Sequence, residues 1–202
     1  YIGGTDYTYW DEDYYWAVGV RSLQTSCSNC NSATYNASNL GAYDRLFHTH
    51  GEAYSNWNVT LGAMVMAGNS AVQASSSSLK QYYWEIYSIM GDPSLMTWLT
   101  QPGDMQISID GEATQNNAYT AMDGATSFTI ATGAPYAYIA LTQNLNFISA
   151  VMADANGNAT LTFPALNVGE TYELAASAQN YKTQFTTITV EASNTPRVTL
   201  QS

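Results

Sequence analysis

The sequence predicts two successive parts of different fold class, a helix-containing part over residues 1–100 and an all-β sandwich of the immunoglobulin-like type over residues 101–202. All five Trp, both Cys and both His lie before residue 99. From residue 103 onward the chain instead alternates in short runs rich in Thr, Ala, Val and Tyr, a pattern typical of strands. Gln101-Pro102-Gly103 separates the two patterns and predicts a turn at the boundary.

Two helices of the first part follow from the spacing of apolar residues. Residues 60–74 place apolar side chains on one face, and Gly62 and Gly68 within this segment predict close packing against a neighbouring element. Residues 11–18 predict a short helix that ends at Gly19.

A third helix is predicted over residues 79–90, with Ser78 at its N-cap position. Gly91 suits the position just after the helix, and Pro93 prevents the helix from continuing. Asp92 can accept hydrogen bonds from the amides that follow it, which would hold this turn without any role in chemistry.

The second part predicts seven short strands, at residues 105–109, 127–131, 137–142, 147–152, 159–163, 172–178 and 185–190. Residues 154–158 (DANGN) predict a tight turn in which Gly157 adopts a positive φ. The Cys-Trp-Cys core of true immunoglobulin domains is absent, so the sandwich is of the general type. Because these residues hold no nucleophile or metal cluster, the simplest interpretation is a packing or spacer domain.

The charge balance excludes two classes of partner. Sixteen acidic residues against five basic ones give a net charge of -11, and charged residues make up only 10% of the chain. Binding to a nucleic-acid backbone needs a clustered basic face, and so does a polybasic membrane anchor. No apolar run approaches the 18 or so residues of a membrane span. The sequence therefore predicts neither a nucleic-acid partner nor a membrane-spanning segment.

The start of the chain suggests a larger context. Tyr1 stands where a Met would begin a new protein, and it leads directly into Ile2 and two glycines. The chain has sixteen tyrosines and few lysines, a composition typical of secreted and cell-surface proteins. We therefore expect the C-terminal portion of a longer, exported precursor.

Residues 9–16 (YWDEDYYW) combine aromatic side chains with three consecutive carboxylates. In one interpretation the acids complement the dipole at a helix N-terminus, each by about 0.3–1 kcal/mol, and the aromatics face the core. In a second, a carboxylate beside Tyr and Trp walls binds a Lys ammonium or an Arg guanidinium. In a third, the acidic triplet ligates calcium. The residues alone leave these interpretations open.

Two cysteines and two histidines form another candidate site. Cys27 and Cys30 have the spacing of a zinc half-site, and His48 and His50 could complete four ligands. The cysteines lie in a Ser/Asn-rich run of a chain expected to be exported, so a local disulfide between them is the alternative, with free thiols the third. Nothing in the sequence points to a Cys-His catalytic pair among these residues.

Five blocks that occur in order along the chain carry a resemblance to a known family. They are residues 1–4 (YIGG), 9–16 (YWDEDYYW), 67–69 (AGN), 82–85 (YYWE) and 90–96 (MGDPSLM). Their succession closely resembles the C-terminal part of the gingipain cysteine peptidase domain, especially in its lysine-specific branch. The residues that follow look like the immunoglobulin-like domain that succeeds the catalytic domain in that family.

The resemblance implies a caspase-like α/β fold for residues 1–100, as the C-terminal portion of a catalytic domain. The family's catalytic His and Cys both precede the YIGG segment, so the dyad would lie upstream of this chain. Cys27, Cys30, His48 and His50 match no dyad position, and the segment with the two cysteines is a departure from the family.

The resemblance also implies a specificity pocket for the P1 residue of a substrate. Asp13 resembles the carboxylate that binds a P1 lysine, Trp10 the aromatic that covers its aliphatic stem, and Tyr9 lies beside Trp10. We therefore expect cleavage after Lys, with Arg as the alternative. The pocket interpretation of Asp13 now outweighs that of a helix-terminal charge.

The implied partners are the N-terminal portion of the same precursor, which would carry the dyad, and protein or peptide substrates. No cofactor is required, although an exported, acid-rich chain could hold structural calcium or sodium ions. We expect a secreted or cell-surface protein of the bacterial exported type. Two other functions remain open, a non-catalytic surface or adhesion protein that keeps the peptidase scaffold and a zinc-binding module.

Overall fold

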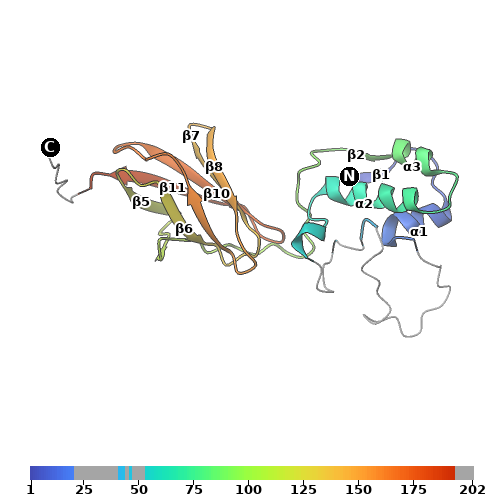
Figure 1. Ribbon diagram of the computed structural model, residues 1–202, viewed down its shortest axis with the longest axis horizontal. Helices are drawn as coiled ribbons and strands as arrows, with labels where there is room; N and C mark the ends of the chain where they lie inside the picture. Colours follow the sequence, from blue (N-terminus) through green and yellow to red (C-terminus); the bar gives the residue numbers. More distant parts are fainter. Residues whose placement is uncertain (21–40, 44–45, 47–52, 194–202) are drawn as a thin grey trace, which may run out of the picture. The chain divides into compact units, whose positions relative to one another are not determined.

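The computed structural model describes residues 1–20, 41–43, 46 and 53–193, and the chain divides into two compact units, Tyr1–Leu99 and Thr100–Ser202 (Figure 1). The candidate zinc or disulfide residues Cys27, Cys30, His48 and His50 lie outside the described residues. No helix among the described residues is long and apolar enough to cross a membrane.

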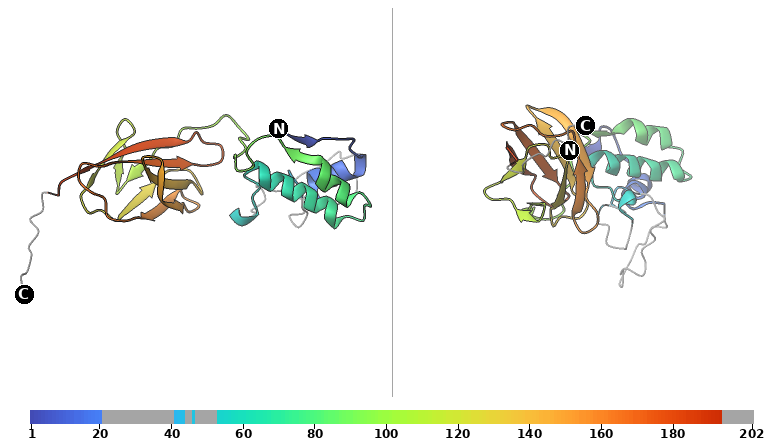
Figure 2. Two further views of the ribbon diagram at one scale, coloured as in Figure 1. Left: turned by 90° about the horizontal axis from the view of Figure 1, so that it is seen from above. Right: turned by 60° about the vertical axis from the view of Figure 1, so that its left-hand side comes forward.

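The first unit combines helices with a small antiparallel sheet. Its helices are α1 (Trp10–Val18), α2 (Leu61–Ala74) and α3 (Lys80–Ile86), and its strands are β1 (Ile2–Gly4) and β2 (Tyr87–Ile89). Helices α1 and α2 pack against each other, and α2 also contacts β2, beside which it lies in Figures 1 and 2. A 3-10 turn, Tyr54–Asn56, precedes α2.

The contact of α1 with α2 depends on a missing side chain. A Cβ built on Gly68 would lie 2.3 Å from Cε2 of Trp16, so only glycine lets the indole approach α2 this closely. The Nε1 of Trp16 donates to Oδ1 of Asn69 at 2.9 Å, which satisfies a buried polar pair. The side chain of Thr60 accepts from the amide of Ala63 and caps α2. The predicted helix over residues 60–74 and its close packing at Gly68 are confirmed.

The prediction of one helix over residues 79–90 is wrong in its second half. Helix α3 ends at Ile86, and the next three residues form β2, which pairs with β1 in the register Ile2↔Ile89. A Tyr-Ser-Ile run suits a strand, and the backbone of β1 supplies partners that the local sequence does not reveal. Ser78 is also not the N-cap residue, which is Leu79; the amide of Leu79 donates to Oγ of Ser77.

Two other local predictions of the first part are confirmed. Helix α1 ends before Gly19, which has φ +83°. Oδ1 of Asp92 accepts from the amide of Ser94 at 2.8 Å and from its hydroxyl at 2.7 Å. These bonds lower the pKa of the exposed Asp92 carboxyl and hold the turn as expected.

The second unit consists of two facing sheets. One has the order β5-β11-β10-β7-β8 and the other β4-β3-β6-β9, and β11–β5 is the parallel pair among otherwise antiparallel neighbours. The strands are β3 (Ser108–Ile109), β4 (Glu112–Ala113), β5 (Ala118–Met122), β6 (Ser127–Ala131), β7 (Tyr138–Gln143), β8 (Asn146–Met152), β9 (Asn158–Thr162), β10 (Thr171–Ser177) and β11 (Gln184–Glu191).

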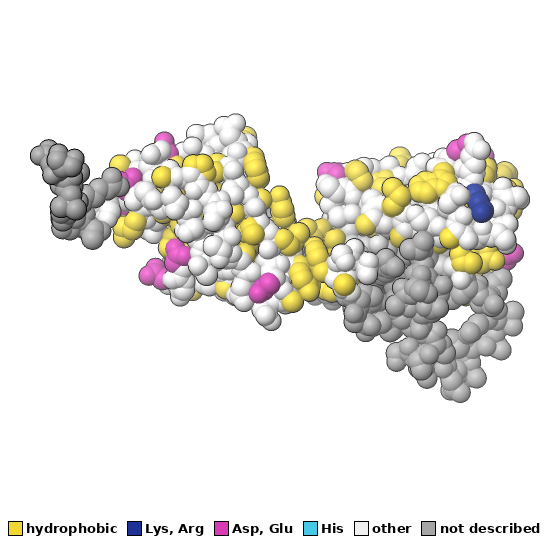
Figure 3. Space-filling view, viewed as in Figure 1, with side chains coloured by type: hydrophobic (Ala, Val, Ile, Leu, Met, Phe, Trp, Pro, Cys, Tyr) yellow, Lys and Arg dark blue, Asp and Glu magenta, His cyan; other side chains and the backbone are white. Residues whose placement is uncertain are grey.

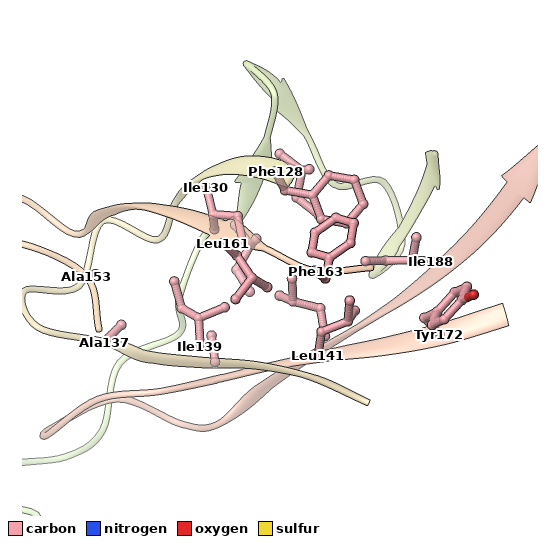
Figure 4. Close-up of a cluster of buried hydrophobic side chains, with 14 of the residues drawn as sticks. Phe128, Ile130, Ala137, Ile139, Leu141, Ala153, Leu161, Phe163, Tyr172 and Ile188 are labelled. Atoms are coloured by element: carbon pink, nitrogen blue, oxygen red, sulfur yellow. The ribbon is translucent and has the colours of Figure 1, made fainter. Parts of the chain in front are cut away.

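Alternating residues of both sheets meet in a single apolar core (Figure 4). Phe128 of β6 and Phe163, just after β9, pack with ring centroids 4.6 Å apart. Ile139 and Leu141 of β7 are fully buried from the opposite sheet. Burying each such side chain stabilises the fold by about 1.5–3 kcal/mol, so this core accounts for the arrangement of the unit.

Each of the seven predicted strand segments overlaps an observed strand, and in the first segment the strand is limited to Ser108–Ile109. Strands β4 and β5 were not predicted, because β4 is two residues long and β5 (AYTAM) lacks clear alternation. The predicted turn is confirmed: Oδ1 of Asp154 accepts from the amides of Asn156 and Asn158 at 2.8 and 2.9 Å. Gly157 has the expected positive φ of +80°.

Candidate functional site

A hollow of about 310 Å³ lies in the first unit where its sheet meets α1 and α2. Its walls come from β1, α1, α2 and β2, together with one residue of the segment before α2. The lining residues are Ile2, Gly3, Asp13, Trp16, Ala17, Tyr43, Met64 and Tyr87. Among the described residues of this lining, Asp13 is acidic and none is basic.

The side chain of Asp13 is held by two tyrosine hydroxyls that come from the other end of the unit. Its Oδ1 accepts from the hydroxyl of Tyr83 at 3.0 Å and from that of Tyr87 at 2.9 Å. Tyr83 lies on α3 and Tyr87 begins β2, so both are brought to α1 by tertiary packing. The carboxylate is therefore positioned by the fold and not by its own helix alone.

The hydroxyl of Tyr83 also ties the start of α1 to α3. It accepts from the amide of Tyr9 at 2.8 Å and lies 3.0 Å from the carbonyl oxygen of Tyr9. A phenol has one proton, so this hydroxyl donates either to Asp13 or to the Tyr9 carbonyl at any moment. Tyr87 differs, since Asp13 is the hydrogen-bond partner of its hydroxyl within the described residues.

Three aromatic rings fix the direction of these hydroxyls. The rings of Trp16 and Tyr87 stack with centroids 4.4 Å apart and an interplanar angle of 22°. Tyr87 and Tyr83 stack in turn at 5.5 Å and 21°. Tyr87 is thus held on both faces, and its hydroxyl cannot swing away from Asp13 without disturbing the stack.

The tyrosines remain donors at neutral pH. Burial raises the pKa of Tyr83 and of Tyr87 above the ordinary tyrosine value, and the hydrogen bond to Asp13 and its negative charge add to both shifts. Among the described residues, no Lys or Arg forms an ion pair with Asp13. Within the part of the chain that the structure describes, the hollow therefore presents a carboxylate that is hydrogen-bonded but not paired with a cation.

The other two residues proposed for the pocket lie outside the hollow. Tyr9 precedes α1 and its side chain is 48% exposed, while Trp10 begins α1 and is 83% exposed. The ring of Tyr9 makes an edge contact with Tyr82, with centroids 6.0 Å apart. The structure therefore brings Asp13 into the hollow and leaves Tyr9 and Trp10 at the surface.

The three consecutive carboxylates do not share their partners. Asp11 is exposed, Oε1 of Glu12 accepts from the hydroxyl of Ser77, and Asp13 is held by the two tyrosines. In the described part of the chain no group of three His, Cys, Asp or Glu side chains could hold a metal ion. Figure 3 shows acidic side chains scattered over the drawn face and not gathered at one place.

A second hollow, of about 320 Å³, lies between the 3-10 turn and α2. Its lining residues are Ser55, Asn56, Trp57, Asn58, Ala63, Met66, Ala67 and Ser70. None of these described lining residues titrates near neutral pH. The hollow with Asp13 is therefore the better candidate for a charged ligand.

Sequence reasoning missed the part played by Tyr83 and Tyr87. Both lie in the segment 79–90 that was predicted as one helix, in which their spacing of four residues would place the two side chains on one helical face. Their separation from Asp13 by 70 or more residues hides the contact. The one available signal was their hydroxyls, since buried tyrosines usually find a hydrogen-bond partner.

The fold and the site together define a mixed helix-and-sheet unit with a carboxylate-bearing hollow, followed by a unit of two facing sheets. Comparison with known proteins narrows this class. No sequence profile of a protein family matches the chain. Lys-gingipain W83 of Porphyromonas gingivalis is 26% identical over 188 residues, which cover 90% of this chain and 10% of that relative. The chain thus spans about a tenth of the curated relatives that it matches.

Solved structures agree on the fold. One described as a protease has a TM-score of 0.66 and 23% identity, covering 93% of this chain and 39% of that one. The Arg-specific cysteine proteinase gingipain R has a TM-score of 0.60 and 18% identity, covering 74% and 33%. A complex of the RgpB pro- and mature domains of Porphyromonas gingivalis has a TM-score of 0.58 and 18% identity, covering 74% and 34%. The chain is related to the gingipains, as its sequence predicted.

Proposed function

We propose that this chain is part of a secreted or cell-surface, gingipain-like cysteine endopeptidase and supplies its P1 pocket for Lys, with Arg as the alternative. The first unit is the C-terminal portion of a caspase-like catalytic domain, and the second is an immunoglobulin-like domain. The catalytic His and Cys belong to the preceding portion of the same precursor, which is the chain's partner. The relation to Lys-gingipain over 90% of the chain supports this assignment.

The observation that carries the proposal is the Asp13 carboxylate in its hollow. Two tyrosine hydroxyls hold it, and within the described residues no cation neutralises it. A carboxylate in such a place can bind a substrate cation, because the charge-assisted hydrogen bonds of the ion pair compensate for the hydrogen bonds to water that both groups lose.

The remaining walls suit the stem of a lysine. Ile2, Trp16 and Met64 offer apolar contact to the four methylenes, while the ammonium reaches the carboxylate. Tyr9 and Trp10 precede Asp13 by one turn of α1 and lie outside the hollow. We assign them to the rim, where they contact the part of the substrate that stays outside.

The chemistry needs groups from the preceding portion of the precursor. There a Cys thiolate attacks the scissile carbonyl, a His carries protons between thiol and leaving amine, and backbone amides stabilise the oxyanion. The present chain contributes the fixed position of the P1 side chain. Accurate positioning of the scissile bond against the nucleophile is itself a large part of the rate acceleration.

The test uses the precursor that contains this chain, with peptides carrying Lys, Arg or a neutral residue at P1. We expect kcat/KM to be highest for Lys. The substitution Asp13→Asn should lower kcat/KM for Lys by roughly 100-fold or more, since breaking a buried ion pair costs about 3–5 kcal/mol. Hydrolysis of the neutral peptide should change little.

The matched control is Asp11→Asn, which removes an exposed carboxylate two residues away on the same helix. It should leave the preference for Lys intact. Equal rates on all three peptides in the unmodified protein would overturn the pocket assignment. A preference for Lys that survives Asp13→Asn would place the pocket elsewhere.

A further inference from the structure

The two oxygens of the Asp13 carboxylate are not equivalent. Oδ1 accepts from both Tyr83 and Tyr87, at 3.0 and 2.9 Å. Oδ2 has no hydrogen-bond partner among the described residues. A carboxylate offers about four lone-pair sites, two on each oxygen, so Tyr87, together with Tyr83 whenever Tyr83 directs its one proton to Asp13, takes up acceptor capacity of Oδ1 and none of Oδ2.

This inequality bears on which cation the hollow can bind. A guanidinium forms its strongest pair with a carboxylate through two parallel N–H···O bonds, one to each oxygen. An ammonium is a compact charge that needs only one oxygen and can satisfy its other protons elsewhere. With Oδ1 occupied, the carboxylate can still form the one bond that an ammonium needs, but only one of the two parallel bonds that a guanidinium forms.

We infer that Tyr87, assisted by Tyr83, is a specificity-determining residue of this site: its hydroxyl occupies Oδ1 of Asp13, leaves Oδ2 for the ligand, and so selects a primary ammonium over a guanidinium. The inference rests on the proposed function, because it concerns the same hollow. It adds a role for residues that are not themselves part of the cation contact.

The aromatic stack makes the arrangement rigid. Tyr87 lies between Trp16 at 4.4 Å and Tyr83 at 5.5 Å, so its ring, and with it the phenolic oxygen beside Oδ1 of Asp13, cannot move aside for the second arm of a guanidinium without disturbing the stack. Tyr83 has a further task, since it also accepts from the amide of Tyr9. Tyr87 is the cleaner residue to change, because Asp13 is the partner of its hydroxyl in the described part of the chain.

The experiment titrates the full 202-residue chain with Nα-acetyl-lysine amide and with Nα-acetyl-arginine amide, and follows binding by NMR. The unmodified chain should bind the lysine amide more tightly. In Tyr87→Phe the arginine amide should bind more tightly than it does to the unmodified chain. The ratio of the two dissociation constants should shift in favour of arginine by about tenfold, the effect of one hydrogen bond to a charged group.

Tyr82→Phe is the matched control. It removes a tyrosine hydroxyl from α3, next to Tyr83, but that hydroxyl donates to the carbonyl oxygen of Tyr7 and not to Asp13. The ratio of dissociation constants should stay at the unmodified value. A general loosening of the unit would weaken both ligands together, whereas loss of selection changes their ratio.

A second measurement needs no variant and so does not depend on the folding of Tyr87→Phe. Nω-methylation of the arginine amide keeps its charge but blocks the bidentate fork. If Oδ1 is occupied, arginine binds through one arm, and methylation should leave its dissociation constant within about twofold. A loss of tenfold or more would show that both oxygens are available and would overturn the inference.

The outcomes separate the two proposals. If the unmodified chain binds neither amide, or binds the lysine amide equally well after Asp13→Asn, the proposed pocket fails. If binding of the lysine amide depends on Asp13 but Tyr87→Phe leaves the ratio unchanged, the pocket stands and the role of Tyr87 is wrong.

Discussion

The two units of this chain are stabilised by different kinds of contact. The core of the second unit is built mainly from aliphatic side chains of two facing sheets, and it includes the contacting rings of Phe128 and Phe163. The first unit instead buries Trp16 and Tyr83 around polar contacts, such as the bond from Trp16 to Asn69. The difference teaches that one unit relies on burial of area, while the other relies on the fit of a few hydrogen-bonded aromatics.

Leu161→Ala should produce the largest change in stability. Leu161 is fully buried in the second unit, and truncation of such a leucine costs about 2–5 kcal/mol. All five Trp lie in the first unit, so Trp fluorescence follows that unit alone, while far-UV circular dichroism follows both. We expect an early unfolding transition in circular dichroism that Trp fluorescence does not detect.

The matched control for Leu161→Ala is Leu145→Ala, since Leu145 is 96% exposed in the same unit. It should shift the transition by less than about 0.5 kcal/mol. Simultaneous loss of the Trp signal in Leu161→Ala would show that the units unfold together, and the comparison between them would then lose its basis.

Gly68→Ala tests the fit in the first unit. The added Cβ would lie 2.3 Å from Cε2 of the buried Trp16, and overpacking of this kind typically costs about 1–3 kcal/mol. Alanine is the better helix former by about 1 kcal/mol, so a site without the indole would gain stability. Guanidinium unfolding followed by Trp fluorescence should show a loss.

Met66→Ala is the control on the same helix, because Met66 is 59% exposed. It should change the free energy of unfolding by less than about 0.5 kcal/mol. A Gly68→Ala protein as stable as the unmodified chain would mean that Trp16 can move and that the aromatic stack is less rigid than inferred.

The sequence predicted features that depend on contacts between residues close in the chain, and it missed those that depend on distant residues. Alternation identified the strands around Phe128 and Leu141, and local hydrogen bonding identified the turns at Asp92 and Asp154. Strand β2 was missed because its partner β1 lies more than 80 residues away. The same holds for the site, where Asp13 could be singled out but not the tyrosines that hold it, since only the packed fold brings them together.

Thr186→Val should raise stability by a smaller amount. Thr186 lies on β11 and is fully buried, and among the described residues its Oγ1 is the buried side-chain atom without a hydrogen-bond partner. An unsatisfied buried hydroxyl costs about 1–3 kcal/mol, and valine keeps nearly the same shape. We expect a gain of about 1 kcal/mol in the unfolding of the second unit, measured by circular dichroism.

Thr187→Val is the control for Thr186→Val, since the next residue on β11 points to the exposed face. Its effect should be close to zero or slightly unfavourable. If Thr186→Val destabilises the unit, the hydroxyl has a partner in solution, and a buried water is then the natural candidate.

The last prediction concerns alkaline pH, where the hydroxyls of Tyr83 and Tyr87 ionise. The pKa of Tyr83 and of Tyr87 is raised in the folded chain, mainly by burial and then through Asp13, above the unfolded value of about 10. A raised folded pKa means that the stabilisation is fully present below pH 10 and is lost as pH rises from there, because the unfolded chain then releases these protons first.

Alkaline unfolding of the first unit, followed by Trp fluorescence, should therefore begin above pH 10. Tyr87→Phe should move that onset to higher pH and Tyr82→Phe should move it less, since the hydroxyl of Tyr82 donates to the carbonyl oxygen of Tyr7 and not to the Asp13 carboxylate. An onset that Tyr87→Phe leaves unchanged would mean that its hydroxyl ionises as freely in the folded chain as in the unfolded one, and Tyr87 would then not be a fixed donor to Asp13.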